Sequence, residues 1–468
     1  MLIMNKVLFI CFSMIFAISA RAELIGDFEY DLNEQNHTAV VIGKWQYVEA
    51  MDEWCNYVGL LNAEIPNEVE YDNQTYMVTK IDDNAFNACA SLISVTIPNT
   101  VKKIGNSAFG ECSSLTTVIL PNSIETIGEA AFVNCINLIS INLPNSLTSL
   151  SDGIFVGCSS LTSIALPNSI ITIGRGAFSE CSSLSYLEIP NSVLSIGEMA
   201  FENCSALSTI ILPTSISKIS NYMFNRCHSL DNLLLPNSIK SIGLRAFSES
   251  GIESIYIPKN VVEIESSAFY LCQNLTAINV DNANTSFYSI DGVLFSAFQL
   301  IKYPNGKRDI EYTIPSNVST ISNDAFRDCV YLTSINMPKV EDIGERAFQE
   351  CRQLSSVVFP SSIRNIRKQS FWGISTLQFI RCEAIDVPNL GTDAFSDKSV
   401  PLYVPEESMK LYQGATGWCD FFNIYPISTE GLDDAQPKSQ ISYKYLEKNT
   451  IYIVKKGIKY SVLGHAIK

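Results

Sequence analysis

Histidine and basic residues are scarce in this chain of 468 residues. It has three histidines (His37, His228 and His465), and its 32 Lys and Arg face 48 Asp and Glu, giving a net charge of −16. A nucleic-acid-binding protein usually carries a basic stripe, and an anionic membrane surface repels an acidic protein. The composition therefore argues against nucleic acid and against a membrane surface as partners.

Long apolar runs are also missing beyond the N-terminus. The run Val7–Ala20 is too short to cross a bilayer comfortably; Lys6 precedes it, and Ala20-Arg21-Ala22 supplies an A-x-A cleavage site. This pattern predicts a secretory signal peptide over residues 1–22. We expect the mature protein to be secreted or held at the cell surface, without a transmembrane segment.

Motifs for catalysis are lacking as well. The sequence has neither a P-loop nor a G-x-G-x-x-G loop, and His228 is the only histidine inside the repeated region. A Ser-His or Cys-His site needs an imidazole beside its nucleophile, and a metal site would need His or acidic partners near the thiols. We predict that the chain has no catalytic residues, no metal and no cofactor, and is not an enzyme.

What the chain has in abundance is a repeat of about 23 residues. Phenylalanine recurs in 13 phased copies, from Phe86 to Phe269 and again from Phe326 to Phe395. One unit, residues 115–135, combines a Leu-x-x-Val-x-Leu strand pattern, a Pro-Asn turn, a second short extended piece, and Ala-Phe-x-x-Cys, for which we expect a single helical turn. No unit can bury its apolar residues alone, so the units must stack into a leucine-rich-repeat solenoid.

The extent of the repeat divides the chain into segments. Residues 23–80 lack the period and predict a β-rich N-terminal cap, and residues 81–399 form the array. Within the array, residues of about 281–311 predict a hairpin that projects from the solenoid. Residues 400–427 predict a C-terminal cap, 428–440 a polar linker, and 441–468 a small basic tail. We expect a monomer.

Ten of the 14 cysteines lie three residues after a repeat Phe. Stacked residues have parallel Cβ vectors about 4.8 Å apart, whereas a disulfide needs roughly 3.5–4.5 Å and convergent geometry. We therefore predict a column of buried free thiols, formed by Cys89, Cys112, Cys135, Cys158, Cys181, Cys204, Cys227, Cys272, Cys329 and Cys351. The pairing of Cys55, Cys382 and Cys419, which lie outside this column, stays open.

The recurring Ile-Gly-x-x-Ala-Phe-x-x-Cys-x-x-Leu-x-x-Ile-x-Leu-Pro-Asn-Ser closely resembles the BspA-like leucine-rich repeats of host-associated bacteria, over about residues 80–400. The resemblance implies a binding or adhesion protein whose ligand is a protein or a glycan, such as a host extracellular-matrix protein. A structural component of the cell surface without a soluble ligand is the alternative. Residues 444–460 resemble C-terminal sorting tails of exported Gram-negative proteins, although a plain β-hairpin without a sorting role would have the same pattern.

The strand pattern also predicts where a ligand would bind. The three x positions of Leu-x-x-Leu-x-Leu should point outward, and stacking should join them into one surface. Early units present small residues at these positions, such as Thr116 and Thr117. The middle units present aromatic and acidic ones, with Ile211 and Leu234 exposed between them. The alternative is a solvated face with incidental aromatics, and the hairpin around Tyr303 and Asn305 is a second candidate. The predicted ligand-binding residues are Tyr186, Glu188, Asp231, Asn232, Glu253 and Tyr256.

Overall fold

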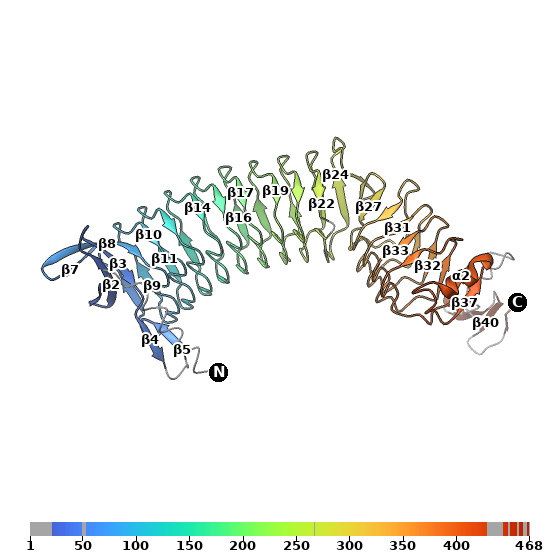
Figure 1. Ribbon diagram of the computed structural model, residues 1–468, viewed down its shortest axis with the longest axis horizontal. Helices are drawn as coiled ribbons and strands as arrows, with labels where there is room; N and C mark the ends of the chain where they lie inside the picture. The colour runs from blue at the N-terminus through green and yellow to red at the C-terminus, as the bar shows by residue number, and fades with distance from the viewer. Residues whose placement is uncertain are drawn as a thin grey trace.

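The computed structural model shows an elongated, bent solenoid of stacked coils (Figure 1). It describes residues 21–48, 53–265, 267–427, 443–447, 450–455, 458–461 and 466–467. Residues 1–20 of the predicted signal peptide and the whole predicted linker lie outside this part of the chain. Within it the helices are η1 (Glu406–Ser408) and α2 (Met409–Gly414), and no helix is long and apolar enough to cross a membrane.

The first side of each coil is a short parallel strand formed by the Leu-x-x-Val-x-Leu pattern, which we call the strand face. In β11 (Thr117–Ile119), Val118 is buried between two exposed neighbours. Thr117 pairs with Ser94 of the preceding coil and Ser140 of the following one, so the register advances by one repeat. The other strands of this face are β6 (Asn62–Glu64), β9 (Ser94–Thr96), β13 (Ser140–Asn142), β16 (Tyr186–Glu188), β18 (Thr209–Ile211), β20 (Asn232–Leu233), β22 (Ser254–Ile257), β24 (Ala277–Val280), β28 (Glu311–Thr313), β30 (Ser334–Asn336), β32 (Ser356–Phe359) and β34 (Phe379–Cys382).

The second side begins after the Pro-Asn turn and consists of two-residue strands. In β12 (Thr126–Ile127) the isoleucine is buried and the threonine exposed, and both pair in parallel with β10 (Lys103–Ile104). This is the second inward-facing extended piece that the sequence predicts. The other strands of this stack are β14 (Ser149–Leu150), β15 (Thr172–Ile173), β17 (Ser195–Ile196), β19 (Lys218–Ile219), β21 (Ser241–Ile242), β23 (Glu263–Ile264), β29 (Thr320–Ile321), β31 (Asp342–Ile343), β33 (Asn365–Ile366) and β35 (Asn389–Leu390).

The third side, which we call the turn face, is built from turns. The prediction of a helical turn in this part of the unit is wrong. Ala130 and Asn134, on either side of Phe132, have φ of 53° and 55°. These left-handed residues cannot continue a right-handed helix. The N–H of Phe132 instead donates to the carbonyl of Ile154 in the next coil at 3.0 Å, and Asn134 donates to Val156 at 2.7 Å. Hydrogen bonds between coils therefore replace the bonds within a helix.

The repeat phenylalanines form the centre of the core. From Phe86 to Phe269 each ring stacks on the next, with centroids 5.2–5.8 Å apart. The stack resumes at Tyr303, which packs 5.0 Å from Phe326, and continues to Phe395. These two stacks confirm that neighbouring units bury their apolar residues against one another.

The predicted column of buried free thiols is confirmed. The nine column cysteines from Cys112 to Cys351 are buried free thiols, and Cys89 is buried at the N-terminal end of the column. The Cys135 thiol, for example, donates to the carbonyl oxygen of Phe109 at 3.1 Å. Burial raises the pKa of Cys158 and of Cys204 to about 12. Of the cysteines left open by the sequence, Cys382 is buried and free, and Cys419 is exposed and free.

Short antiparallel and mixed sheets lie at both ends of the array. At the N-terminal end the strands are β1 (Arg21–Ile25), β2 (Phe28–Asn33), β3 (Thr38–Ile42), β4 (Trp45–Val48), β5 (Glu53–Asn56), β7 (Glu68–Tyr71) and β8 (Gln74–Ile81), and β8 pairs with β10 of the array. At the other end, Trp418 is fully buried and its Nε1 donates to the Pro388 carbonyl at 2.7 Å. The remaining strands are β36 (Leu402–Val404), β37 (Ile424–Pro426), β38 (Tyr443–Glu447), β39 (Thr450–Lys455), β40 (Ile458–Ser461) and β41 (Ala466–Ile467).

The segment expected to project as a hairpin is instead part of the solenoid wall. Strands β25 (Tyr288–Ile290), β26 (Val293–Ser296) and β27 (Gln299–Lys302) form an antiparallel meander, and β27 then pairs in parallel with β29 of the following coil. The turn residues Gly292 and Pro304 correctly predicted that this segment contains strands. It did not show that Leu294 and Phe295 would be fully buried, because alternating and continuous apolar runs look alike in so short a segment.

Candidate binding face

The six predicted ligand-binding residues all lie on one stretch of the strand face. They come from β16, from the coils of β20 and β22, and from the residues next to those strands. All six are exposed. Glu188 pairs with Ile211 of the next coil, and the backbone N–H of Glu253 donates to the Asp231 carbonyl at 3.0 Å. The structure thus brings together side chains that are up to 70 positions apart in the sequence.

A row of apolar side chains runs through this stretch. Ile211, Leu234 and Tyr256 occupy the same x position of successive coils, and their exposed fractions are 47%, 79% and 45%. The buried residues that alternate with them, such as Leu233 and Ile255, anchor each strand to the core. We call this stretch the central strip, defined by Tyr186, Glu188, Ile211, Asp231, Asn232, Leu234, Glu253 and Tyr256.

Acidic groups flank the apolar row, and the strip contains no Lys or Arg. Its three carboxylates are Glu188, Asp231 and Glu253. A fourth, Asp281, accepts a hydrogen bond from Tyr256, and desolvation together with this contact raises the pKa of the Tyr256 hydroxyl. Asp281 was missed in the sequence, although it stands where a regular unit has proline. The strip therefore combines an apolar centre with a negative potential.

Tyr186 lies at the N-terminal end of the strip. Its hydroxyl donates to Glu188 Oε2 at 3.3 Å. Desolvation first, and then the charge and hydrogen bond of Glu188, raise the pKa of the Tyr186 hydroxyl. Both phenols of the strip thus stay protonated at neutral pH, where they present a ring face and a hydrogen-bond donor.

The second candidate site is wrong. Tyr303 and Asn305 are each only 1% exposed. Tyr303 takes the place of a repeat phenylalanine in the core, and its hydroxyl donates to Asp309 at 2.9 Å. Among the described residues, no group of three or more His, Cys, Asp or Glu side chains is arranged to hold a metal ion.

Comparison with known proteins places this architecture in a family. The family model of the BspA-type leucine-rich-repeat region matches residues 79–208, 195–312 and 306–410, which together span most of the chain. The chain belongs to the BspA-type leucine-rich-repeat family. No match was found among the curated proteins.

Solved structures of other leucine-rich-repeat proteins resemble this BspA-type chain. A leucine-rich repeat protein from Bacteroides ovatus is 26% identical with a TM-score of 0.57, covering 87% of this chain and 100% of that one. A leucine rich cell surface protein from Faecalibacterium prausnitzii is also 26% identical, with a TM-score of 0.50, covering 88% of this chain and 96% of that one. The BspA-type family and these neighbours indicate a surface or protein-interaction repeat protein.

Proposed function

We propose that the protein is a secreted or surface-exposed binding protein and that the central strip holds its ligand, a protein with a basic contact surface. The observation that carries the proposal is the row of Ile211, Leu234 and Tyr256, exposed in successive coils. Contiguous exposed apolar side chains with a polar rim are typical of interaction sites. The proposed location outside the cell is supported by the predicted signal peptide and by the similarity to a cell surface protein.

The free energy available from burying the exposed apolar side chains favours a specific contact. Leu234 is 79% exposed, and burying a side chain of its size contributes about 1.5–3 kcal/mol. Tyrosine is enriched among the residues that dominate interfaces, and Tyr186 and Tyr256 stand at the two ends of the strip. With Leu234 and the two tyrosines as anchors of the strip, truncation of any one of them should weaken binding measurably.

The charge of the strip selects the partner. Glu188, Asp231 and Glu253 repel an acidic surface and attract a basic one, which mainly raises the association rate and the specificity. A patch on an extracellular-matrix protein that carries Lys or Arg around an apolar centre would be complementary. Because the charges are exposed, we expect this part of the affinity to weaken as salt is raised.

Solid-phase binding to a panel of purified extracellular-matrix proteins, followed by surface plasmon resonance, tests the proposal. Tyr186→Ala with Tyr256→Ala should weaken binding at least about tenfold, or ~1.4 kcal/mol, with little change in melting temperature. Leu234→Ser should do the same. Ile119→Ser is the matched control, because Ile119 is 75% exposed in the same column of the strand face but outside the strip.

Two outcomes would count against the strip. Unchanged binding by the double tyrosine variant would move the site elsewhere on the molecule. Absence of binding to every panel member and to bacterial cells would favour the alternative, a structural component of the cell surface.

A further inference from the structure

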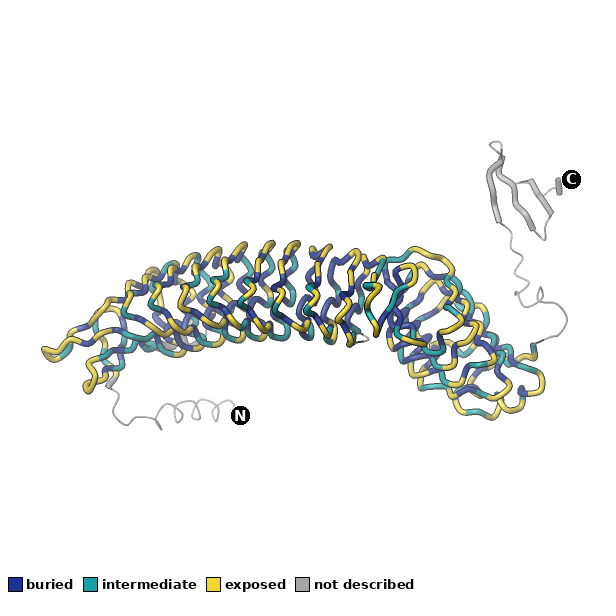
Figure 2. The backbone as a smooth tube through the Cα atoms, turned by 90° about the horizontal axis from the view of Figure 1, so that it is seen from above, coloured by how far each residue is buried: buried dark blue, intermediate teal, exposed yellow. Residues whose placement is uncertain are grey.

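The array consists of two arms that meet at a seam between the coil of Phe269 and the meander β25–β27. The axis of the solenoid changes direction there in two perpendicular views (Figures 1 and 2). The buried apolar residues fall into two clusters. One covers the N-terminal arm up to Ile278 together with Phe287, Leu294 and Ile301, and the other runs from Val293 to Phe421. The two arms thus have largely separate cores.

The regular links between coils stop at the seam. On the strand face, β24 ends one sheet and β28 begins another. On the second side, β23 ends a sheet and β27 and β29 belong to the next. On the turn face, Phe247 still donates to the Ala268 carbonyl, and Tyr303 donates to Ala325, but the described N–H of Phe269 has no backbone partner across the seam. Sheets also end inside the N-terminal arm, between β17 and β19 and between β18 and β20, but there the turn face keeps its bonds, such as that from Asn203 to the Asn225 carbonyl. At the seam all three sides of the coil are interrupted.

Few backbone hydrogen bonds cross the seam in place of the regular links between coils. Gly306 donates to the Leu275 carbonyl at 2.7 Å, and Ile278 donates to Gly292 at 2.8 Å. The meander itself is tied to the C-terminal arm, because Tyr303 stacks on Phe326 and the Asn305 amide donates to the Arg327 carbonyl. A relative movement of the arms would therefore take place on the N-terminal side of the meander, where it would shift the contacts of Leu294 and Ile301 with the N-terminal core.

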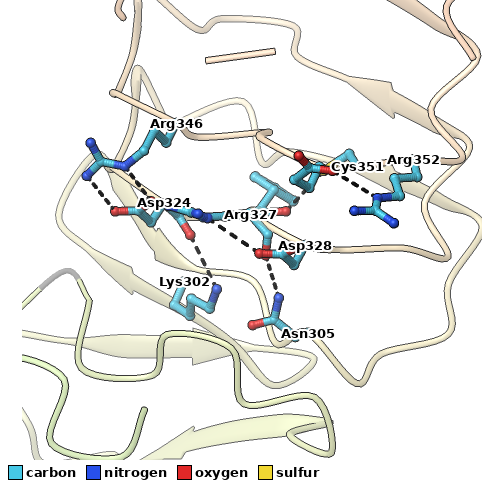
Figure 3. A network of polar contacts seen from close by, with 10 residues as sticks. Lys302, Asn305, Asp324, Arg327, Asp328, Arg346, Cys351 and Arg352 are labelled. Atoms are coloured by element: carbon cyan, nitrogen blue, oxygen red, sulfur yellow. Dashed lines mark hydrogen bonds and ion pairs between the residues drawn. The ribbon is translucent and has the colours of Figure 1, made fainter. Parts of the chain in front are cut away.

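A cluster of charged side chains lies beside this junction, on the meander and the C-terminal arm (Figure 3). Asp324 accepts hydrogen bonds from Arg346 at 3.0 and 3.1 Å and from Arg327 at 3.2 Å. Lys302 is only 3% exposed, because it occupies the position of a buried repeat alanine, and its Nζ donates to the Asp324 carbonyl at 3.3 Å. The cluster holds Arg327 in a fixed place at the edge of the C-terminal arm.

One aromatic ring connects this cluster to the other arm. The guanidinium carbon of Arg327 lies 4.8 Å from the centroid of the Tyr270 ring, and that of Arg245 also lies 4.8 Å from it. Tyr270 and Arg245 belong to the N-terminal arm, and Arg327 belongs to the C-terminal arm. Cation–π contacts of this kind are attractive and directional.

We propose that the seam is a hinge and that the contact of Arg327 with Tyr270 is the clasp that fixes the angle between the arms. The clasp replaces the backbone ladder that the turn face lacks at this point. Loss of the clasp leaves each arm folded, because each has its own phenylalanine stack and its own sheets. The central strip lies just on the N-terminal side of the seam, so the hinge sets how the C-terminal arm faces any molecule bound there.

Pulsed electron-electron distance measurements on the full chain test the hinge. Nitroxide labels at Lys218→Cys and Lys339→Cys, both exposed positions, report the distance between the arms. A second pair, Glu125→Cys with Lys218→Cys, reports the N-terminal arm alone. Cys419→Ser removes the exposed free thiol, and Cys55→Ser removes a cysteine whose pairing the sequence leaves open.

Tyr270→Leu keeps apolar bulk but removes the π face, and Arg327→Met removes the cation. Both should broaden the distance distribution between the arms, or shift its mean by at least about one strand spacing, ~4.8 Å. The distance within the N-terminal arm should not change, and this pair also reports whether each variant is folded. Tyr270→Phe keeps the ring and should behave as the unaltered protein does.

Arg226→Met is the matched control, because Arg226 makes an ion pair with Glu249 at 3.3 Å inside the N-terminal arm. It should leave both distances unchanged. The hinge would be refuted if Tyr270→Leu and Arg327→Met, shown folded by the pair within the arm, kept the distribution between the arms unchanged. It would equally be refuted if Arg226→Met broadened that distribution to the same extent.

Discussion

Replacing one phenylalanine of the stack tests whether the column is the main source of stability. Phe178 is fully buried, and its ring lies 5.6 Å from Phe155 and 5.7 Å from Phe201. Phe178→Ala removes a ring from the middle of the column, where neighbouring coils are held by their own hydrogen bonds and cannot collapse into the space. A buried Phe→Ala change costs about 3–5 kcal/mol, and loss of two stacked pairs favours the upper end.

Urea-induced unfolding followed by circular dichroism measures this loss. Long repeat arrays can depart from two-state behaviour, so the first transition to appear is the one to compare. Phe422→Ala is the control, because Phe422 is 80% exposed, and it should leave the midpoint nearly unchanged. A Phe178→Ala variant as stable as the unaltered protein would show that the column is not the core.

Further predictions concern the thiols and the tail. The column cysteines should react with a thiol reagent only after denaturation, and finding most of them disulfide-linked by mass spectrometry would contradict the structure. Cys158, Cys204 and Cys329 have folded pKa values raised to about 12 from the ordinary 9.0. The unfolded chain therefore loses these protons first as pH rises, and the free energy of unfolding should fall between about pH 9 and 12; a stability independent of pH in that range would show that the thiols are not desolvated. Deleting residues 441–468 should leave the array folded but alter export or surface display in the native host, and unchanged surface exposure would reject a sorting role.

The array was predictable from the sequence because the repeated residues have the same structural role in every unit. The 23-residue spacing of Phe and Cys fixes which side chains share the core, and the alternation around Val118 fixes which ones face outward. The same alternation predicted correctly that Tyr186, Tyr256 and their neighbours would share one exposed face. A ligand-binding role for that face stays a proposal.

The errors arose where tertiary contacts overrule local patterns. Ala-Phe-x-x-Cys has helical spacing, but hydrogen bonds to the next coil hold residues such as Ala130 and Asn134 in left-handed conformations that stop a helix. Tyr303 and Asn305 looked exposed because an insertion usually projects, yet Tyr303 fills a gap in the phenylalanine column. The clasp between Tyr270 and Arg327 joins residues 57 positions apart across an irregular coil, and no periodicity signals it.

Hydrogen–deuterium exchange with and without a bound matrix protein tests the central claim most directly, because it maps the ligand without altering the chain. If the central strip is the binding face, bound partner should slow exchange in peptides covering residues 185–188, 208–211, 231–234 and 253–256, while the equivalent peptide 116–119 stays unchanged. Protection confined to the turn face or to the C-terminal arm, with the strip exchanging as in the free protein, would contradict the account.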